Sequence, residues 1–420
     1  MIYLLYEVCV NISQQQQLNA ISPIDGRYKK LLIQLEDFFS EKALIFYRLK
    51  IELQWLLYLS GLDELNDSSL EVTISSDDRR CIVAVLNDLS YLSPEKVKEI
   101  ESLTNHDVKA VEYYLKDILR QHGASDSLLS LIHFACTSED INNIAYALMI
   151  RDSLKEVVVP KLEELVCELK IKTHEYANVA MISRTHGQAA SPTTFGKEFG
   201  VFLFRIKRQL KQLKSLPIMA KMNGAVGNYN AHYFTFPLVN WQKITKDFIE
   251  NIMDLKCNPM TTQIESHDWI AELNHIVARI NCIGIDLAQD IWQYVSINYL
   301  KQKTKDSEVG SSTMPHKVNP ILFENAEGNL EVANCLLEYM SRKLPISRLQ
   351  RDLTDSTVLR NLGVIFGHST VAFQNIIKGM ERIKPNVDQL QNELQDNEIV
   401  ISEGIQTVLR KYGYDQAYEK

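Results

Sequence analysis

Residues 267–300 read HDWIAELNHIVARINCIGIDLAQDIWQYVSINYL, and this stretch decides the fold. Its apolar residues recur at intervals of three and four, which is the spacing of one face of an α-helix. A helix of about 34 residues is ~50 Å long at a rise of 1.5 Å per residue. A helix so long and so apolar cannot be buried inside one small monomer, so it predicts a long bundle shared between subunits. The apolar positions are Trp269, Ile270, Leu273, Ile276, Val277, Ile280, Ile283, Leu287, Ile291, Trp292 and Val295.

Four further segments are predicted to complete a central bundle of five long helices. The first begins at the capping-box sequence Thr137-Ser138-Glu139-Asp140 and runs to about residue 176, with a kink at Pro160. Only 16 Gly and 11 Pro in 420 residues leave little turn-forming sequence, which disfavours β folds with many turns. The sequence therefore predicts an all-α protein. The other three helices are expected over residues 193–216, from residue 320 onward, and from residue 355 or 356 to about 383.

The chain is expected to contain three helical domains after an N-terminal extension. Residues 1–19 form the extension, and residues 20–125 form an N-terminal domain of shorter helices. Residues 126–365 form the central long-helix bundle, which carries a polar loop at 303–320. Residues 366–420 form a C-terminal helical domain.

Composition and charge narrow the class of protein. With 45 Lys and Arg against 53 Asp and Glu, the formal net charge is −8, which argues against a nucleic-acid partner because phosphate binding needs a basic face. No apolar run approaches the roughly 20 residues of a membrane-spanning helix. The seven scattered cysteines contain no CxxC pair, which favours the reducing cytoplasm. His267 and His275 share a predicted helix without a third ligand nearby in the sequence, so neither a metal nor another cofactor is expected.

The polar segment 303–320, KTKDSEVGSSTMPHKVNP, interrupts the long helices and is a candidate binding loop. Gly310–Thr313 offer successive N–H groups and hydroxyls that suit an anion. Lys317 and Asn319 precede the helix start at Pro320, where the helix dipole favours negative charge. The alternative from spacing alone is a mobile surface loop.

Other polar segments allow either a functional or a structural interpretation. His186 lies beside Gly187 ahead of a helix and is either a catalyst or a structural side chain. At residues 104–107, N-capping by Asn105 or Asp107 is a stronger explanation than a function for His106. The Thr137-Ser138 pair is either a helix cap or a phosphate ligand.

Two further segments have an equally plain alternative. The arginines Arg348, Arg351 and Arg360 stand near Asp352 and Asp355 and could form only a solvated ion-pair network. The NGAVGN segment at residues 223–228 is not GxGxxG and follows no strand, so a nucleotide-binding fold is not expected.

Taken together, these segments resemble one enzyme family. The loop GSSTMPHKVNP at residues 310–320 resembles the signature loop of the fumarase/aspartase superfamily, and six other segments are similar to the adenylosuccinate lyases of the bacterial type whose loop reads MPHKVNP. The resemblance covers about residues 21–420, and the last domain of the family continues several tens of residues beyond YGYDQAYEK, so the C-terminal domain is expected to be incomplete. The six segments are TNHDVKAVEY (104–113), FACTSEDINN (134–143), SRTHGQ (183–188), NGAVGNYNAH (223–232), TTQIE (261–265) and QRDLTDSTVLRN (350–361).

The resemblance implies two steps of purine biosynthesis, the β-elimination of fumarate from adenylosuccinate to give AMP and from SAICAR to give AICAR. The implied general base is Ser311, with Ser312 as the alternative that the sequence leaves open, and the implied general acid is His186. Lys317 and Asn319 match residues that hold the carboxylate on which negative charge develops. The family also implies a cytoplasmic homotetramer with active sites shared between subunits, no cofactor, and neither nucleic acid nor membrane as a partner.

The substrate carries a phosphate and two carboxylates, so several positive or hydrogen-bond-donating groups must converge on it. The segments that match the family's binding motifs supply such groups. The implied substrate-binding residues are Arg27, Tyr28, Asn105, His106, Asp107, Thr137, Ser138, Gln263, Lys317, Asn319, Asn325, Arg351, Ser356, Thr357, Val358, Leu359 and Arg360.

Two alternative functions remain open from the sequence. One is another fumarate-releasing lyase, such as argininosuccinate lyase or fumarase, although NHDVKAVEY and TTQIE argue against it. The other is a non-catalytic structural paralogue on the same bundle, which is expected to have lost His186, Ser311 or Lys317, and all three are present.

Overall fold

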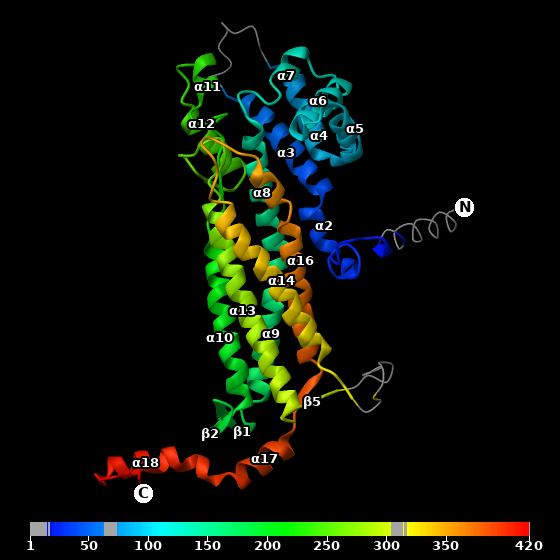
Figure 1. Cartoon of the computed structure of the whole chain (residues 1–420). Coiled ribbons are helices and arrows are strands. Elements are labelled where there is room, and N and C mark those ends of the chain that lie inside the picture. Colours follow the sequence, from blue (N-terminus) through cyan, green and yellow to red (C-terminus); the bar gives the residue numbers. More distant parts are fainter. Residues whose placement is uncertain (1–14, 16, 63–73, 304–313, 315–316, 420) are drawn as a thin grey trace. The chain divides into compact units, whose positions relative to one another are not determined.

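The computed structural model describes residues 15, 17–62, 74–303, 314 and 317–419 (Figure 1). The chain divides into two compact units. Unit 1 comprises Met1–Val158, Ser215–His275 and Leu337–Gly367, and unit 2 comprises Val159–Lys214, Ile276–Leu336 and His368–Lys420. Helices dominate both units, and the strands found in the described residues form only short two-stranded pairs, which confirms the predicted all-α class. No described helix is both long enough and apolar enough to cross a membrane.

Unit 1 is built around α3 (Glu41–Leu59), which packs against α6 (Asp107–Gln121) and α8 (Ser138–Ser153). The α3 side chains of Leu49, Leu53 and Trp55 have no exposed surface, so this helix is buried on several faces. Each such side chain contributes about 1.5–3 kcal/mol by leaving water, which makes α3 the anchor of the unit. The other elements of unit 1 are α2 (Ile33–Phe39), α4 (Ser76–Asn87), α5 (Pro94–Thr104), α7 (Asp126–Ser130), β3 (Met219–Ala220), α11 (Asn230–Thr235), α12 (Trp241–Asp247), β4 (Lys256–Cys257) and α15 (Thr354–Leu359).

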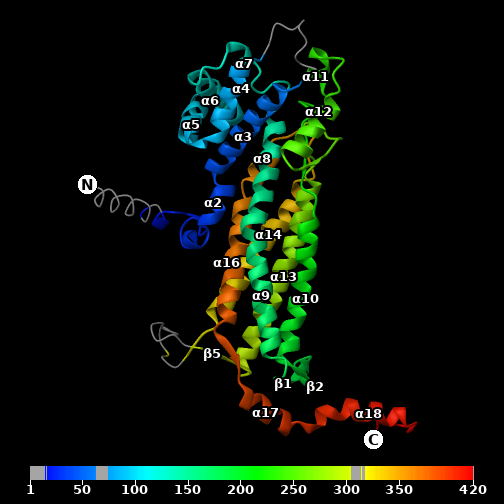
Figure 2. The same cartoon turned by 180° about the vertical axis from the view of Figure 1, so that it is seen from behind.

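Unit 2 is a bundle of long helices that lie side by side (Figure 2). Gly196 makes the approach of two of them possible, because a Cβ there would lie 2.4 Å from the backbone oxygen of Thr173. The buried Asn281 side chain donates to the Asn334 side chain at 3.0 Å and to the Ser369 hydroxyl at 3.1 Å, which joins three helices. The bundle contains α9 (Val159–Glu175), α10 (Phe195–Ser215) and the unit 2 parts of α13 (Asp268–Ser296), α14 (Ile321–Lys343) and α16 (Leu362–Met380).

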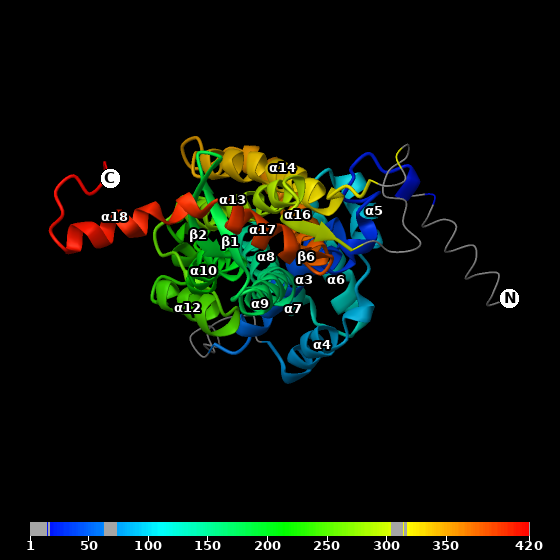
Figure 3. The same cartoon turned by 90° about the horizontal axis from the view of Figure 1, so that it is seen from below.

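Short strands and two further helices lie at one end of this bundle (Figure 3). The antiparallel hairpin of β1 (Ala180–Thr185) and β2 (Gln188–Thr194) joins α9 to α10, and β5 (Leu300–Gln302) pairs with β6 (Ile383–Pro385). Helix α17 (Val387–Asp396) packs against β1, and Glu393 on α17 pairs with Arg184 on β1. Helix α18 (Ser402–Lys411) is the last helix of the described residues.

Most of the long helices begin and end close to the residues that the sequence predicted. The helix predicted over 267–300 is α13, which stops at Ser296 because Asn298 adopts a left-handed φ of 61° and Leu300 enters a strand. The predicted kink at Pro160 corresponds to a π-helical turn over Leu154–Val158, since proline has no N–H to offer the carbonyl four residues earlier.

The single helix predicted from residue 355 or 356 to about 383 is wrong. The structure has two helices there, α15 and α16, separated at Arg360 and Asn361. The Asn361 side chain donates to the Thr357 carbonyl at 3.1 Å and so takes the place of a backbone donor, which explains the interruption.

Candidate active site

The predicted site residues are divided between the two units, and each group is described within its own unit. Ser311 and Ser312, the alternative general bases, lie outside the described residues. Unit 1 contains Arg27, Tyr28, Asn105, His106, Asp107, Thr137, Ser138, Gln263, Arg351 and Ser356–Arg360. Unit 2 contains His186, Lys317, Asn319 and Asn325.

The start of α6 brings a partly buried carboxylate between two guanidinium groups. Asp107 accepts from Arg48 at 2.7 Å and lies 3.5 Å from Nη2 of Arg360, which also pairs with Glu41. Burial by itself would raise the pKa of Asp107, but Arg48, the Val108 amide and Arg360 together lower it. Asp107 is therefore ionised at neutral pH, and together with Glu41 it holds the exposed Arg360 side chain in place.

The capping prediction for residues 104–107 is wrong about the residue that caps the helix. His106 is the N-cap of α6, with its Nδ1 atom accepting from the Lys109 amide at 3.2 Å. Asn105 instead ends α5 in the left-handed conformation, with φ of 52°. Asparagine tolerates this conformation better than most residues, and an imidazole nitrogen is an uncommon cap, so the preference for Asn and Asp at N-caps pointed to the wrong residue.

A cavity of about 230 Å³ lies within unit 1 beside residues 25–28, whose sequence DGRY includes the predicted residues Arg27 and Tyr28. Its lining includes Asp25, Lys29, Glu36, Ser40 and Arg360, so two positive and two negative side chains line it. Arg27 is exposed, and the Tyr28 amide donates to the Pro23 carbonyl at 2.9 Å. The structure therefore places the predicted residue Arg360 and the DGRY segment at one cavity.

The N-terminus of α8 confirms the predicted capping box and adds a buried ion pair. The Thr137 amide donates to the Asp140 carboxylate at 2.8 Å. Asp140 also pairs with Lys221 at 2.9 Å and accepts from the amides of Asn223 and Gly224 at 3.0 and 3.2 Å. Both members of the ion pair are fully buried. The NGAVGN segment is thus bound through its backbone to a structural carboxylate, a role that spacing in the sequence did not suggest.

The segments around Gln263 and Arg351 meet in a third group of unit 1. Nη1 of Arg351 lies 3.1 Å from Glu139 and 3.3 Å from the Gln263 side-chain oxygen. The network of arginines with Asp352 and Asp355 is wrong for two of the three, because among the described residues only Arg348 forms an ion pair with either aspartate, Asp352. Arg351 and Arg360 instead pair with carboxylates on other segments, Glu139 and Asp107.

The predicted residues on α15 differ in what they can offer a ligand. Ser356 is partly exposed and Thr357 is exposed, whereas the side chains of Val358 and Leu359 are buried. Leu359 nevertheless lines a cavity of about 130 Å³ together with Arg360.

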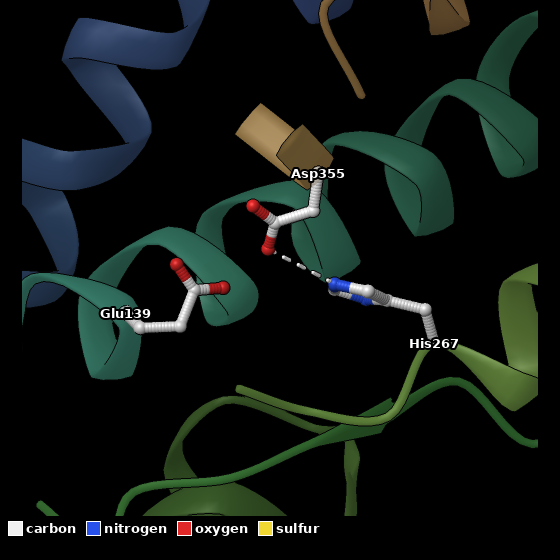
Figure 4. Close-up of side chains that lie close together, drawn as sticks. All are labelled: Glu139, His267 and Asp355. Carbon is white, nitrogen blue, oxygen red and sulfur yellow. Dashed lines mark ion pairs between the residues drawn. The ribbon is translucent and has the colours of Figure 1, made fainter. Parts of the chain in front are cut away.

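Near these residues lies a buried cluster that the sequence analysis did not identify. Glu139, His267 and Asp355 come from three different segments and point toward one another (Figure 4). Nε2 of His267 lies 3.5 Å from the Asp355 carboxylate, and its Nδ1 lies 3.8 Å from Glu265. His267 was predicted to be the first residue of a helix, but it precedes α13 and has a left-handed φ of 61°. This turn aims the imidazole at the cluster, and no local pattern indicates it.

In unit 2, His186 lies at the tip of the β1–β2 hairpin. His186 and Gly187 form its two-residue turn, with φ of 54° and 75°, and the His186 side chain is exposed. The sequence analysis missed this hairpin, although His-Gly with two positive φ values is a usual hairpin turn. Arg184 attaches the hairpin to its surroundings by bonding to Glu393 and to the Tyr299 hydroxyl.

The other predicted residues of unit 2 lie at the start of α14. The Lys317 amide donates to the Met314 carbonyl at 3.0 Å, and the Lys317 side chain is exposed. Asn319 is partly buried just before the helix. Asn325, one turn into α14, accepts from Asn375 at 2.6 Å and from Asn329 at 3.0 Å.

Comparisons with known proteins agree with this architecture. Residues 34–333 match a protein family described as "Lyase", and residues 347–420 match one described as "Adenylosuccinate lyase C-terminal". The chain therefore belongs to the helical lyases of the fumarase/aspartase type. A solved fumarate lyase from a Mesorhizobium species has the same fold, with a TM-score of 0.73 at 17% identity over 92% of this chain and 84% of that one. The carboxymuconate cycloisomerase of Acinetobacter calcoaceticus also shares the fold, with a TM-score of 0.70 at 16% identity over 90% of this chain and 82% of that one.

Closer relatives identify the particular family. An adenylosuccinate lyase of Legionella pneumophila is 50% identical over 96% of this chain and 88% of its own length. An adenylosuccinate lyase of Escherichia coli is 45% identical, again over 96% of this chain and 88% of its own length. The chain belongs to the adenylosuccinate lyases, which are carbon–nitrogen lyases.

Proposed function

We propose that this protein releases fumarate from adenylosuccinate to give AMP, and from SAICAR to give AICAR, as two steps of purine biosynthesis. The observation that carries the proposal is the pair of cationic groups in unit 1, Arg351 and Arg360. Each is held by a carboxylate from another segment and each lies within a motif that matches the family. A substrate with a phosphate and two carboxylates needs such oriented cations.

The proposed mechanism begins with removal of a proton from the carbon beside a succinyl carboxylate. Ser311 is the proposed general base, and Lys317 and Asn319 stabilise the negative charge that develops on the carboxylate. His186 protonates the nitrogen as its bond to carbon breaks, which releases fumarate. The exposed position of His186 at a hairpin tip supports this role, because the imidazole is not covered by other described residues of the chain.

We further propose that the enzyme is a homotetramer in which several chains contribute to each active site. Exposed apolar side chains on the bundle helix α10, including Val201 and Phe204, support a role for this helix in subunit contacts. A cytoplasmic location is supported by the six cysteines within the described residues, all of which are free thiols.

Purified protein with adenylosuccinate, followed by ultraviolet absorbance and by fumarate release, tests the function. Loss of substrate with an equal yield of fumarate is the expected result, and SAICAR is tested in the same way. Argininosuccinate and malate serve as substrates for the alternative lyases. Turnover of either of these, without turnover of adenylosuccinate, would refute the proposal.

A further inference from the structure

Three buried side chains of unit 1 form a compact group next to Arg351, which is a predicted substrate-binding residue. We call Glu139, His267 and Asp355 the buried acid–histidine cluster. They have exposed fractions of 2%, 2% and 6%, and their candidate ligand atoms all lie within 4.8 Å of one another. Glu139 stands in the first turn of α8, His267 directly before α13, and Asp355 in the first turn of α15 (Figure 4). The cluster therefore joins three segments that are distant in the sequence.

The cluster contacts Arg351 through one carboxylate. Oε2 of Glu139 lies 3.1 Å from Nη1 of Arg351, and the side-chain oxygen of Gln263 lies 3.3 Å from the same nitrogen. Gln263 is itself held, because its side-chain nitrogen donates to the Ala225 carbonyl at 2.8 Å. Among the described residues, both of these contacts use Nη1, and the structure shows none that uses Nη2 or Nε. Because the guanidinium is planar and rigid, holding Nη1 also sets the direction of the other two nitrogens.

The charged groups in and around the cluster act on the pKa values of both Glu139 and His267. Burial raises the pKa of Glu139, and Arg351 and His267 oppose that rise. Burial would lower the pKa of His267, but Asp355, Glu265 and Glu139 raise it overall. Three acids thus face two cations, and a buried carboxylate without its cation would be strongly destabilising.

The same three residues could in principle bind a metal ion, but their surroundings favour a different role. Arg351 already places a positive charge 3.1 Å from Glu139, which repels a divalent cation. Both ring nitrogens of His267 already lie within ion-pair distance of a carboxylate, Nε2 at 3.5 Å from Asp355 and Nδ1 at 3.8 Å from Glu265. A built ion-pair network therefore fits the geometry better than a metal site.

We propose that Glu139, supported by His267 and Asp355, is a positioning residue that orients Arg351 for substrate binding. This inference rests on the proposed function, because it concerns the substrate of that same site. Glu139 is not expected to touch the substrate. It acts through Arg351, so its contribution to substrate binding disappears when the Arg351 side chain is absent.

A double-mutant cycle in the full chain tests this role. The variants are Glu139→Gln, Arg351→Ala and the combination of both, with kcat and KM measured for adenylosuccinate. We expect Glu139→Gln to raise KM about tenfold or more while kcat changes less than threefold. In the Arg351→Ala background, the same substitution is expected to change KM less than twofold. Equal factors in both backgrounds, or an unchanged KM in Glu139→Gln, would overturn the proposal.

Glu52→Gln is the matched control, because it also neutralises a buried carboxylate of unit 1. Glu52 pairs with His133 at 2.6 Å and makes no contact with Arg351 among the described residues. We expect this control to keep a wild-type KM. Should Glu139→Gln fail to fold, Glu139→Asp replaces it, since the shorter side chain withdraws from Arg351 and keeps the charge. A raised KM is again expected, and a wild-type KM would overturn the proposal.

Two further experimental results bear on the proposal independently of the double-mutant cycle. Wild-type protein that does not cleave adenylosuccinate refutes the proposed function itself, whereas an active wild type with additive variants refutes only the role of Glu139. Activity lost on treatment with EDTA and restored by Zn²⁺ or Mn²⁺ would identify the cluster as a metal site and overturn the positioning role. Unchanged activity in EDTA is the expected result.

Discussion

Acidification is expected to destabilise the protein through one buried histidine, His232. This side chain has no exposed surface, and neither ring nitrogen has a hydrogen-bond partner among the described residues. Its ring packs edge-on against Trp241, with the ring centres 4.9 Å apart. Burial lowers the pKa of His232 from 6.5 to about 4, with Asp140 opposing the change and Lys221 adding to it. The folded protein therefore holds this imidazole neutral under conditions in which the unfolded chain binds a proton.

The magnitude follows from proton linkage. Between pH 7 and pH 4 the unfolded chain binds more protons at this residue than the folded chain, so stability falls as the pH falls. With pKa values of 6.5 unfolded and about 4 folded, the loss is about 2 kcal/mol at pH 5 and about 3 kcal/mol at pH 4. His232→Phe, which keeps a flat apolar ring and removes the titration, is expected to abolish this part of the pH dependence.

Urea unfolding at pH 7 and pH 5 measures the effect in wild-type and variant protein. The drop in unfolding free energy between the two pH values is expected to be about 2 kcal/mol smaller in His232→Phe than in the wild type. His174→Gln is the control, because His174 is exposed, and it is expected to behave as the wild type does. Equal drops in the wild type and in His232→Phe would refute the reasoning.

Three further predictions concern the active site and the bundle. His186→Ala and Ser311→Ala are each expected to abolish turnover, while light scattering still shows a tetramer. If active sites are shared between subunits, mixing the two variants after partial denaturation is expected to restore some activity. Full activity in either single variant would refute the role proposed for the substituted residue. Arg351→Ala is expected to raise KM for adenylosuccinate more than it lowers kcat, because it removes a binding cation, and an unchanged KM would contradict this. Gly196→Ala is expected to lower the free energy of unfolding measured in urea by about 1–3 kcal/mol, because the alanine Cβ would lie 2.4 Å from the Thr173 backbone oxygen. A wild-type free energy of unfolding in this variant would show that the two helices can move apart without cost.

The sequence predicted the helices well where burial is periodic and ends are marked by local chemistry. The apolar spacing of residues 267–300 predicted α13 to within a few residues, and the Thr137–Asp140 capping box is present at the start of α8. The motifs around Arg351 and Gln263 also identified two side chains that the structure brings into contact. These features depend on residues that are close together in the chain, because the local sequence determines the φ and ψ preferences and the spacing of the side chains.

Only the tertiary structure determines which side chains that are distant in the sequence contact one another. Nothing in the spacing of Glu139, His267 and Asp355 indicates a cluster, and Asp140 was expected to cap a helix rather than to pair with Lys221 as well. Such pairs depend on the packing of segments far apart in the chain, and that packing is set by the sum of many apolar contacts. Periodicity determines that a residue faces the interior. The partner that it meets there is determined by the folded arrangement of the other helices.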